Sequence, residues 1–163
     1  MLMIGWQEWV ALPELDLVAL KAKADTGAKT SALHAENVQF EKVDTETFVT
    51  FDVTPSRRRP GLVINVRAPL IDLRDVTSSN GTVERRPVIA TILEVGPHRA
   101  SVDITLTNRS DMTSRMLIGR QALAALGLCV DPSATFLMPK LGYKAYPNWR
   151  RSGSALPRRS NAP

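Results

Sequence analysis

The chain has 163 residues, of which 44% are hydrophobic and 23% are charged, with a formal net charge of +5. This length and composition exclude a largely disordered chain and predict one domain with a sizeable core. Five basic residues and no acidic residue follow Tyr143, so they account for the whole excess of positive charge. We therefore expect a domain over 1–143 and a basic, flexible tail over 144–163. Nucleic-acid binding through this tail is the weaker hypothesis.

The single cysteine, Cys129, excludes an intramolecular disulfide and favours a reducing compartment. Polar residues and Pro13 interrupt the hydrophobic residues near the N-terminus, so neither a signal peptide nor a membrane span is expected. The expected location is the cytoplasm.

The first half of the chain predicts short strands. A strand over 6–12 ends at Pro13, and a second strand over 17–24 leads directly to Asp25. Residues 31–35 fit either a helical turn or the start of a strand. Further on, 38–43 and 47–53 are rich in β-forming residues, the second also alternates, and the two fit the arms of a hairpin; a strand over 62–66 follows.

The second half predicts more strands and a single helix. Asn80-Gly81 joins strands over 71–77 and 82–89 as a polar hairpin whose tip projects from the body. Further strands are expected over the apolar or alternating ranges 88–95, 100–106 and 135–138, and an apolar run over 116–118 ends at Gly119-Arg120. The only strong helix signal covers 121–126 and stops at Gly127.

One stretch combines an acidic side chain with a tight turn. Asp25-Thr26-Gly27-Ala28 follows an apolar strand, and glycine permits a sharp reversal there. Taken alone, Asp-Thr-Gly is more often a structural turn than a site, since aspartate side chains bond to their own backbone.

The order of the motifs is more specific than the turn. An acidic turn, a projecting hairpin and Leu117-Ile118-Gly119-Arg120 before a short helix together resemble the retropepsin-like aspartic proteases. The longer string over 21–34, with Glu8-Trp9-Val10 upstream, is similar to one bacterial branch of that family. This branch is labelled ATP-dependent zinc protease, or RimK-associated retropepsin-like protein.

The resemblance implies a mainly β fold, the closed barrel of acid proteases with one short C-terminal helix. It also implies a homodimer in which Asp25 of each subunit is catalytic and a peptide or protein is the substrate. The remaining roles concern the turn, the flap and the residues beneath the site. Thr26, Gly27 and Ala28 would support the turn, Ser79, Asn80 and Gly81 would form the flap, and Ile118, Gly119 and Arg120 would lie under the site.

Two features depart from the family pattern. Retroviral members pair the arginine of the Gly-Arg motif with an acidic residue after the turn, whereas this chain has Lys29-Thr30-Ser31 there, so Arg120 lacks that partner. Neither a zinc motif nor a phosphate-binding loop is found, so we expect no metal site and neither zinc nor ATP as cofactor. His34 and His98, the only histidines, are expected to be structural.

Two functions remain open. The first is an aspartic endopeptidase, in which two Asp25 carboxylates share a proton and activate a water molecule. The second is a non-catalytic module that binds a peptide or a partner, such as an ATP-grasp peptide ligase, in the same cleft. The resemblance to RimK-associated proteins suggests that partner.

Overall fold

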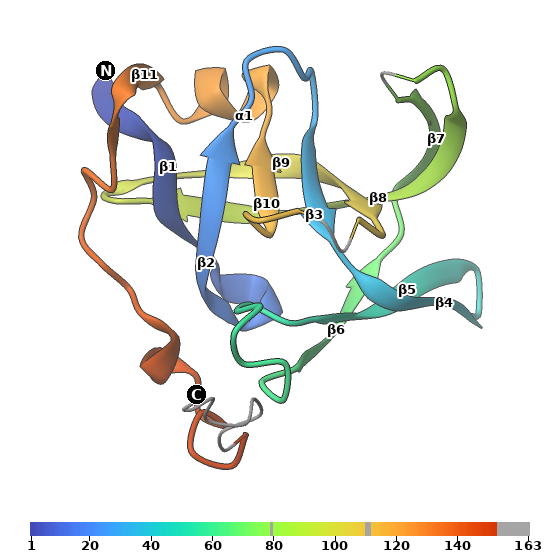
Figure 1. Ribbon diagram of the computed structural model, residues 1–163. Coiled ribbons are helices and arrows are strands. Elements are labelled where there is room, and N and C mark those ends of the chain that lie inside the picture. Colours follow the sequence, from blue (N-terminus) through green and yellow to red (C-terminus); the bar gives the residue numbers. More distant parts are fainter. Residues whose placement is uncertain (79, 110–111, 153–163) are drawn as a thin grey trace.

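Strands make up most of the chain in the computed structural model, which describes residues 1–78, 80–109 and 112–152 (Figure 1). The predicted mainly β class is confirmed, and the one α-helix among the described residues is short. The strands are β1 (Leu2–Leu12), β2 (Leu17–Ala24), β3 (Ser31–His34), β4 (Glu36–Val43), β5 (Glu46–Val53), β6 (Ile64–Pro69), β7 (Asp72–Thr77), β8 (Val83–Val95), β9 (His98–Thr107), β10 (Met116–Ile118) and β11 (Leu128–Thr135). The α-helix is α1 (Arg120–Ala125), and the short 3-10 helices are η1 (Pro13–Leu15) and η2 (Tyr143–Ala145).

Eight strands form one sheet in the order β11-β1-β2-β10-β3-β9-β8-β7, and β1 also pairs with β8. The second pairing joins the six strands β1, β2, β10, β3, β9 and β8 into a ring. The ring is joined between β1 and β8 by one residue pair, Ala11 with Glu94. Where the resemblance implies a closed barrel, the structure thus has a ring of six strands.

The core lies inside this ring because alternate side chains of its strands are apolar. In β2, Leu20 and Ala22 are buried, whereas Lys21 and Lys23 face outward. Leu20 meets side chains from other strands, including Leu33, Ile104 and Met116, in one apolar cluster. The undecided segment after the acidic turn is thereby settled as β3, because it pairs with β9 on one side and with β10 on the other.

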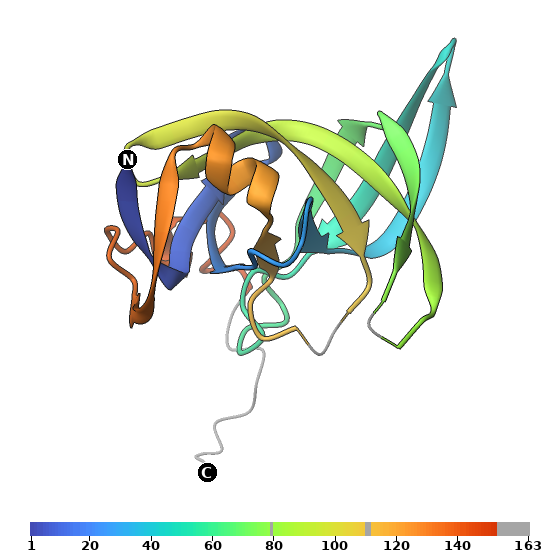
Figure 2. The same ribbon diagram turned by 90° about the horizontal axis from the view of Figure 1, so that it is seen from above.

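A separate three-stranded sheet, β4-β5-β6, extends to one side of the ring (Figure 2). The predicted hairpin between β4 and β5 is confirmed, with Val43 paired to Glu46 at its tip. The next strand begins at Ile64 rather than Leu62, since Leu62 is buried in a second apolar cluster with Trp9 and Tyr146.

The strand predicted over 135–138 is wrong. The last strand among the described residues is β11, which ends at Thr135 and runs parallel to β1. Beyond it, the backbone N–H groups of Leu137 and Met138 donate to the carboxylate of Glu8, which is 1% exposed. A buried side chain thus satisfies the donors that a strand neighbour would otherwise bind.

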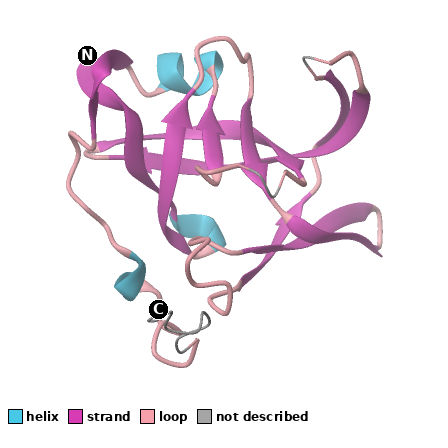
Figure 3. Ribbon diagram, in the orientation of Figure 1, coloured by secondary structure: helices cyan, strands magenta, loops and turns pink. Residues whose placement is uncertain are grey.

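Part of the predicted tail packs on the domain. The helix η2 lies beside the domain (Figure 3), and Tyr146 after it is 2% exposed. Its hydroxyl donates to the Ala19 carbonyl at 2.6 Å and accepts from the Ala19 N–H at 3.1 Å. Arg59 stacks on Trp149, with the guanidinium carbon 3.6 Å from the ring centroid. The flexible tail stays a prediction for 153–163, which lie outside the described residues.

No helix within the described residues has the length and apolar character needed to cross a membrane.

Candidate active site

Asp25 is the first residue after β2, and its half-buried side chain is oriented by its own turn. The backbone N–H of Gly27 donates to Asp25 Oδ1 at 3.1 Å. The N–H of Ala28 donates to the Asp25 carbonyl at 3.2 Å, which closes the chain reversal. The carboxylate is therefore held by a backbone donor and still reaches solvent.

The strand β10 lies between β2 and β3, the two strands that flank the acidic turn (Figure 1). It runs parallel to β2, with Ile118 opposite Ala24, and antiparallel to β3, with Leu117 opposite Ala32. At its end, the Ile118 carbonyl accepts the N–H of Asp25 at 2.8 Å. Two sequence motifs far apart in the chain thus form one local structure.

Gly119 is in contact with the far side of the turn. A Cβ added at this position would lie 2.6 Å from the carbonyl carbon of Thr30 and 3.0 Å from the carbonyl oxygen of Ala28. The Gly119 N–H donates to the buried hydroxyl of Ser31 at 3.0 Å. Only glycine fits this approach of two backbones, which explains why the motif requires it.

Arg120 stabilises the acidic turn by donating hydrogen bonds to two of its backbone carbonyls. Its N–H donates to the Ala28 carbonyl at 2.7 Å, and its Nη1 donates to the Thr26 carbonyl at 3.2 Å. The Thr26 carbonyl therefore accepts from the Arg120 side chain, which lacks an acidic partner after the turn. The residues predicted to support the turn are brought together here, whereas the Arg120–carbonyl contact had no sequence signal.

A cleft of about 1000 Å³ separates the acidic turn from the β7–β8 hairpin. Its walls include Asp25, Gly27 and Ala28 on one side, and Ser78 and Asn80 on the other. The hairpin is closed where the Ser78 N–H donates to the Thr82 carbonyl at 2.8 Å, and Gly81 takes the left-handed conformation with φ +87°. Of the three predicted flap residues, Asn80 lines this cleft, Gly81 lies in the turn, and Ser79 lies outside the described residues.

A second hollow, of about 540 Å³, also reaches Asp25. Trp6, Gln7, Lys23 and Met112 line it together with Asp25. Residues of β1 and of the segment before β10 are too far from the acidic turn in sequence for any short-range pattern to reveal them. Asp25, Arg109 and Leu117 line both hollows.

The two histidines serve the fold. His34 is 3% exposed, and its Nδ1 accepts the backbone N–H of Arg109 at 2.9 Å. His98 Nδ1 is 2.6 Å from the Leu126 carbonyl. Within residues 1–78, 80–109 and 112–152, no three histidine, cysteine or acidic side chains are grouped so that they could hold a metal ion. The expectation of no zinc continues to rest on the sequence motifs.

Comparison with known proteins places this geometry in a family. The family model described as RimB-like, retropepsin-like aspartic endopeptidase RimB, matches residues 3–141. A crystal structure of Lpg0085, a protein of unknown function from Legionella pneumophila, superposes with a TM-score of 0.69. The two chains are 26% identical, over 83% of this chain and 97% of that one.

Curated relatives carry the name probable alpha-L-glutamate ligase. One from Shewanella halifaxensis is 42% identical over 83% of this chain and 29% of its own length. Another, from Desulfotalea psychrophila, is 42% identical over 80% of this chain and 28% of its own length. The chain thus spans less than a third of the length of these relatives. With its acidic turn, its Gly-Arg motif and the match over 3–141, the chain belongs to the RimB-like family of retropepsin-like aspartic endopeptidases.

Proposed function

We propose that the protein is an aspartic endopeptidase that acts as a homodimer, with Asp25 of each subunit forming the catalytic pair. The observation that carries this proposal is the ion pairing of the other carboxylates in the cleft. Its other described carboxylates are already ion-paired, Asp75 with Arg85 at 3.2 Å and Glu84 with Arg86. Since the reaction needs two carboxylates close together, the second is supplied by a second copy of the chain.

The chemistry follows from two carboxyl groups at short range. Like charges disfavour double ionisation, so the two carboxylates share one proton. The ionised carboxylate takes a proton from water as general base, while the protonated partner polarises the peptide carbonyl. The exposed Thr26 would brace the two turns across the dimer axis, and the β7–β8 hairpin would close over the substrate.

A non-catalytic module is the second candidate. The relatives named as glutamate ligases are more than three times as long as the region they share with this chain. A domain of this kind within a ligase-named protein supports a role as a partner of an ATP-grasp peptide ligase. On this hypothesis the cleft binds a peptide tail and Asp25 only shapes the turn.

The test is cleavage by the purified full chain between mildly acidic and neutral pH. The substrates are denatured casein and a peptide of α-linked glutamates, which the name of the relatives suggests. Asp25→Asn is expected to lower the rate at least about 100-fold, as for loss of a general acid–base group. Analytical ultracentrifugation should show the same dimer for both proteins. Asp44→Asn is the matched control, because this exposed turn residue has φ +57°, which asparagine tolerates.

Two results decide against the proposal. Cleavage that survives Asp25→Asn and stops with a chelator means a metal mechanism. If the wild type cleaves neither substrate but binds an ATP-grasp ligase, and Asp25→Asn binds it equally well, the protein is a binding module.

A further inference from the structure

The β7–β8 hairpin has little backbone support at its outer end. Strand β7 is the last strand of the large sheet and pairs with β8 among the described strands. Strand β8 pairs with β9 from Val88 onward, whereas Val83 to Pro87 pair with β7. The part of the hairpin that lies over the cleft is therefore positioned by side chains as well as by its own ladder.

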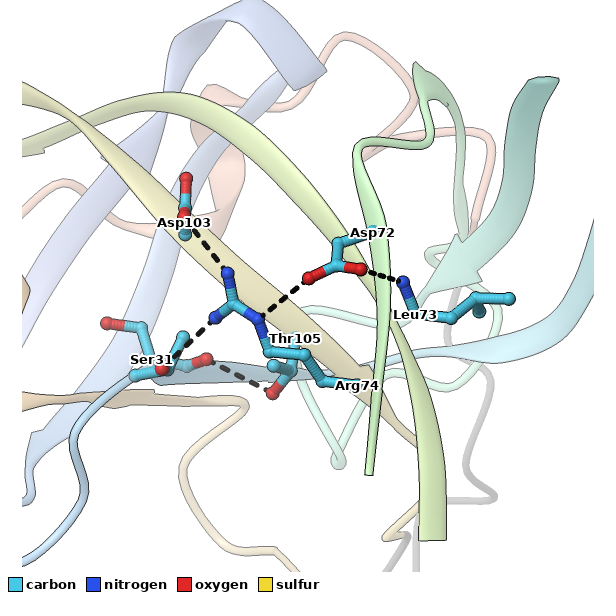
Figure 4. A network of polar contacts seen from close by, with 7 residues as sticks. Ser31, Asp72, Leu73, Arg74, Asp103 and Thr105 are labelled. Carbon is cyan, nitrogen blue, oxygen red and sulfur yellow. Dashed lines mark hydrogen bonds and ion pairs between the residues drawn. The ribbon is translucent and has the colours of Figure 1, made fainter. Parts of the chain in front are cut away.

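Arg74 on β7 makes two side-chain contacts that leave the hairpin (Figure 4). Its Nε donates to Asp72 of the same strand at 3.1 Å. Its Nη2 lies 3.5 Å from Asp103 Oδ2 on β9, and its Nη1 lies 3.5 Å from Thr30 Oγ1. Thr30 belongs to the segment whose backbone packs against Gly119. One guanidinium thus bridges the hairpin, the central sheet and the segment that follows the acidic turn.

We propose that Arg74 is a positioning residue, a latch that holds the β7–β8 hairpin over the cleft through Asp103 and Thr30. The importance of the latch for substrate rests on the proposed function, in which the cleft binds the peptide. Opening the hairpin breaks the contacts to Asp103 and Thr30 and keeps the Asp72 contact, since Asp72 moves with Arg74.

The latch is weak enough to open. The side chains of Arg74 and Asp103 are 37% and 41% exposed, and solvent screens ion pairs between such groups. Both outward contacts are 3.5 Å long, at the outer limit of hydrogen bonding. On the other strand, Thr107 Oγ1 donates to Glu84 at 3.2 Å, so the hairpin keeps one attachment when Arg74 is removed. Loss of the latch therefore loosens the hairpin without unfolding it.

Hydrogen–deuterium exchange of the amides over 72–88, measured without substrate, tests the latch. Arg74→Met and Asp103→Asn are each expected to speed exchange roughly two- to fivefold, the range for loss of an exposed ion pair. Arg99→Gln is the matched control, because it also removes an exposed ion pair, that with Glu94, but one that lies outside the hairpin. It should leave the exchange as in the wild type.

Kinetics separate positioning from direct contact with substrate. Arg74 lines the cleft, whereas Asp103 is absent from the cleft walls. Both variants are expected to raise KM by a similar factor with little change in kcat. Exchange over 72–88 in both variants that equals the Arg99→Gln control would overturn the latch. So would a rise in KM for Arg74→Met alone, which would mean that Arg74 contacts the peptide directly. Because exchange needs no turnover, an inactive protein would refute the proposed function and still test the latch.

Discussion

Tyr146 is the residue by which the C-terminal segment is attached to the domain. Its hydroxyl both donates to and accepts from the backbone of Ala19 in β2. Tyr146→Phe leaves these two buried backbone groups without a partner, so we expect the free energy of unfolding to fall by about 1–3 kcal/mol. Urea denaturation monitored by tryptophan fluorescence measures the change. Trp149→Phe is the control for altering an aromatic side chain of the same segment, because it keeps the contacts between Tyr146 and Ala19.

The same tyrosine makes stability depend on alkaline pH. Burial raises the pKa of Tyr146, and also that of Tyr143, above the ordinary tyrosine value of 10.0. The unfolded chain therefore loses these protons first, and the stability they contribute, complete below pH 10, falls as the pH rises above that value. Tyr146→Phe should show a shallower decline than the wild type when unfolding is followed between about pH 9 and pH 11. An equal slope in both proteins would contradict a buried, protonated Tyr146.

Asp25 shows what can be predicted at the scale of one residue. An aspartate before Thr-Gly at the end of an apolar strand is visible in the sequence, and so is its capacity for acid–base chemistry. The acceptor of Arg120 was not visible, because the Thr26 carbonyl is a backbone group that every residue carries. Sequence patterns identify side chains and say little about which backbone groups they meet.

At the scale of elements, the contact between β10 and the acidic turn leaves no room for a larger residue than glycine. Gly119→Ala would place its Cβ against backbone atoms of Thr30, which cannot move aside as a flexible side chain does. We expect a loss of about 1–3 kcal/mol in the free energy of unfolding, as for other overpacked sites, together with loss of cleavage. Thermal and urea denaturation measure the first effect, and the casein assay measures the second.

Ser31→Ala is the companion variant for this contact. It removes the hydroxyl that accepts the Gly119 N–H and adds no steric clash. The expected loss of stability is about 1–3 kcal/mol, because the buried N–H of Gly119 loses its acceptor. A Gly119→Ala protein as stable as the wild type would show that the turn and β10 are not held in this close packing.

How closely an element was predicted depends on the hydrophobic pattern of its own residues. Alternating segments such as β2, β5 and β9 were predicted close to their observed bounds, because one face of each strand is apolar. The short β3 was ambiguous, since four residues carry too little periodicity. The position of β11 was missed because its pairing with β1 joins opposite ends of the chain.

At the scale of the whole molecule, the folded region extends beyond Tyr143, the expected end of the domain, and includes Tyr146 and Trp149. Truncation after Ser152 keeps Tyr146 and Trp149 with their contacts to Ala19 and Arg59, so the melting temperature should stay within about 1–2 °C of the full chain. Truncation after Tyr143 removes both contacts and should lower it by several degrees. Equal melting temperatures for the two truncations would show that the segment adds no stability. The Ser152 truncation also tests nucleic-acid binding by Arg158 and Arg159 without disturbing the domain.

The sequence by itself determined the mainly β class, the acidic turn, the Gly-Arg motif and the hairpin, because each depends on neighbouring residues. Only the tertiary structure decided that β10 lies between β2 and β3, that β1 meets β8, and that Tyr146 docks on β2. The physical reason is that alternation determines the two faces of a strand but leaves its neighbours open. Those neighbours are chosen by packing and hydrogen bonding among segments far apart in the chain.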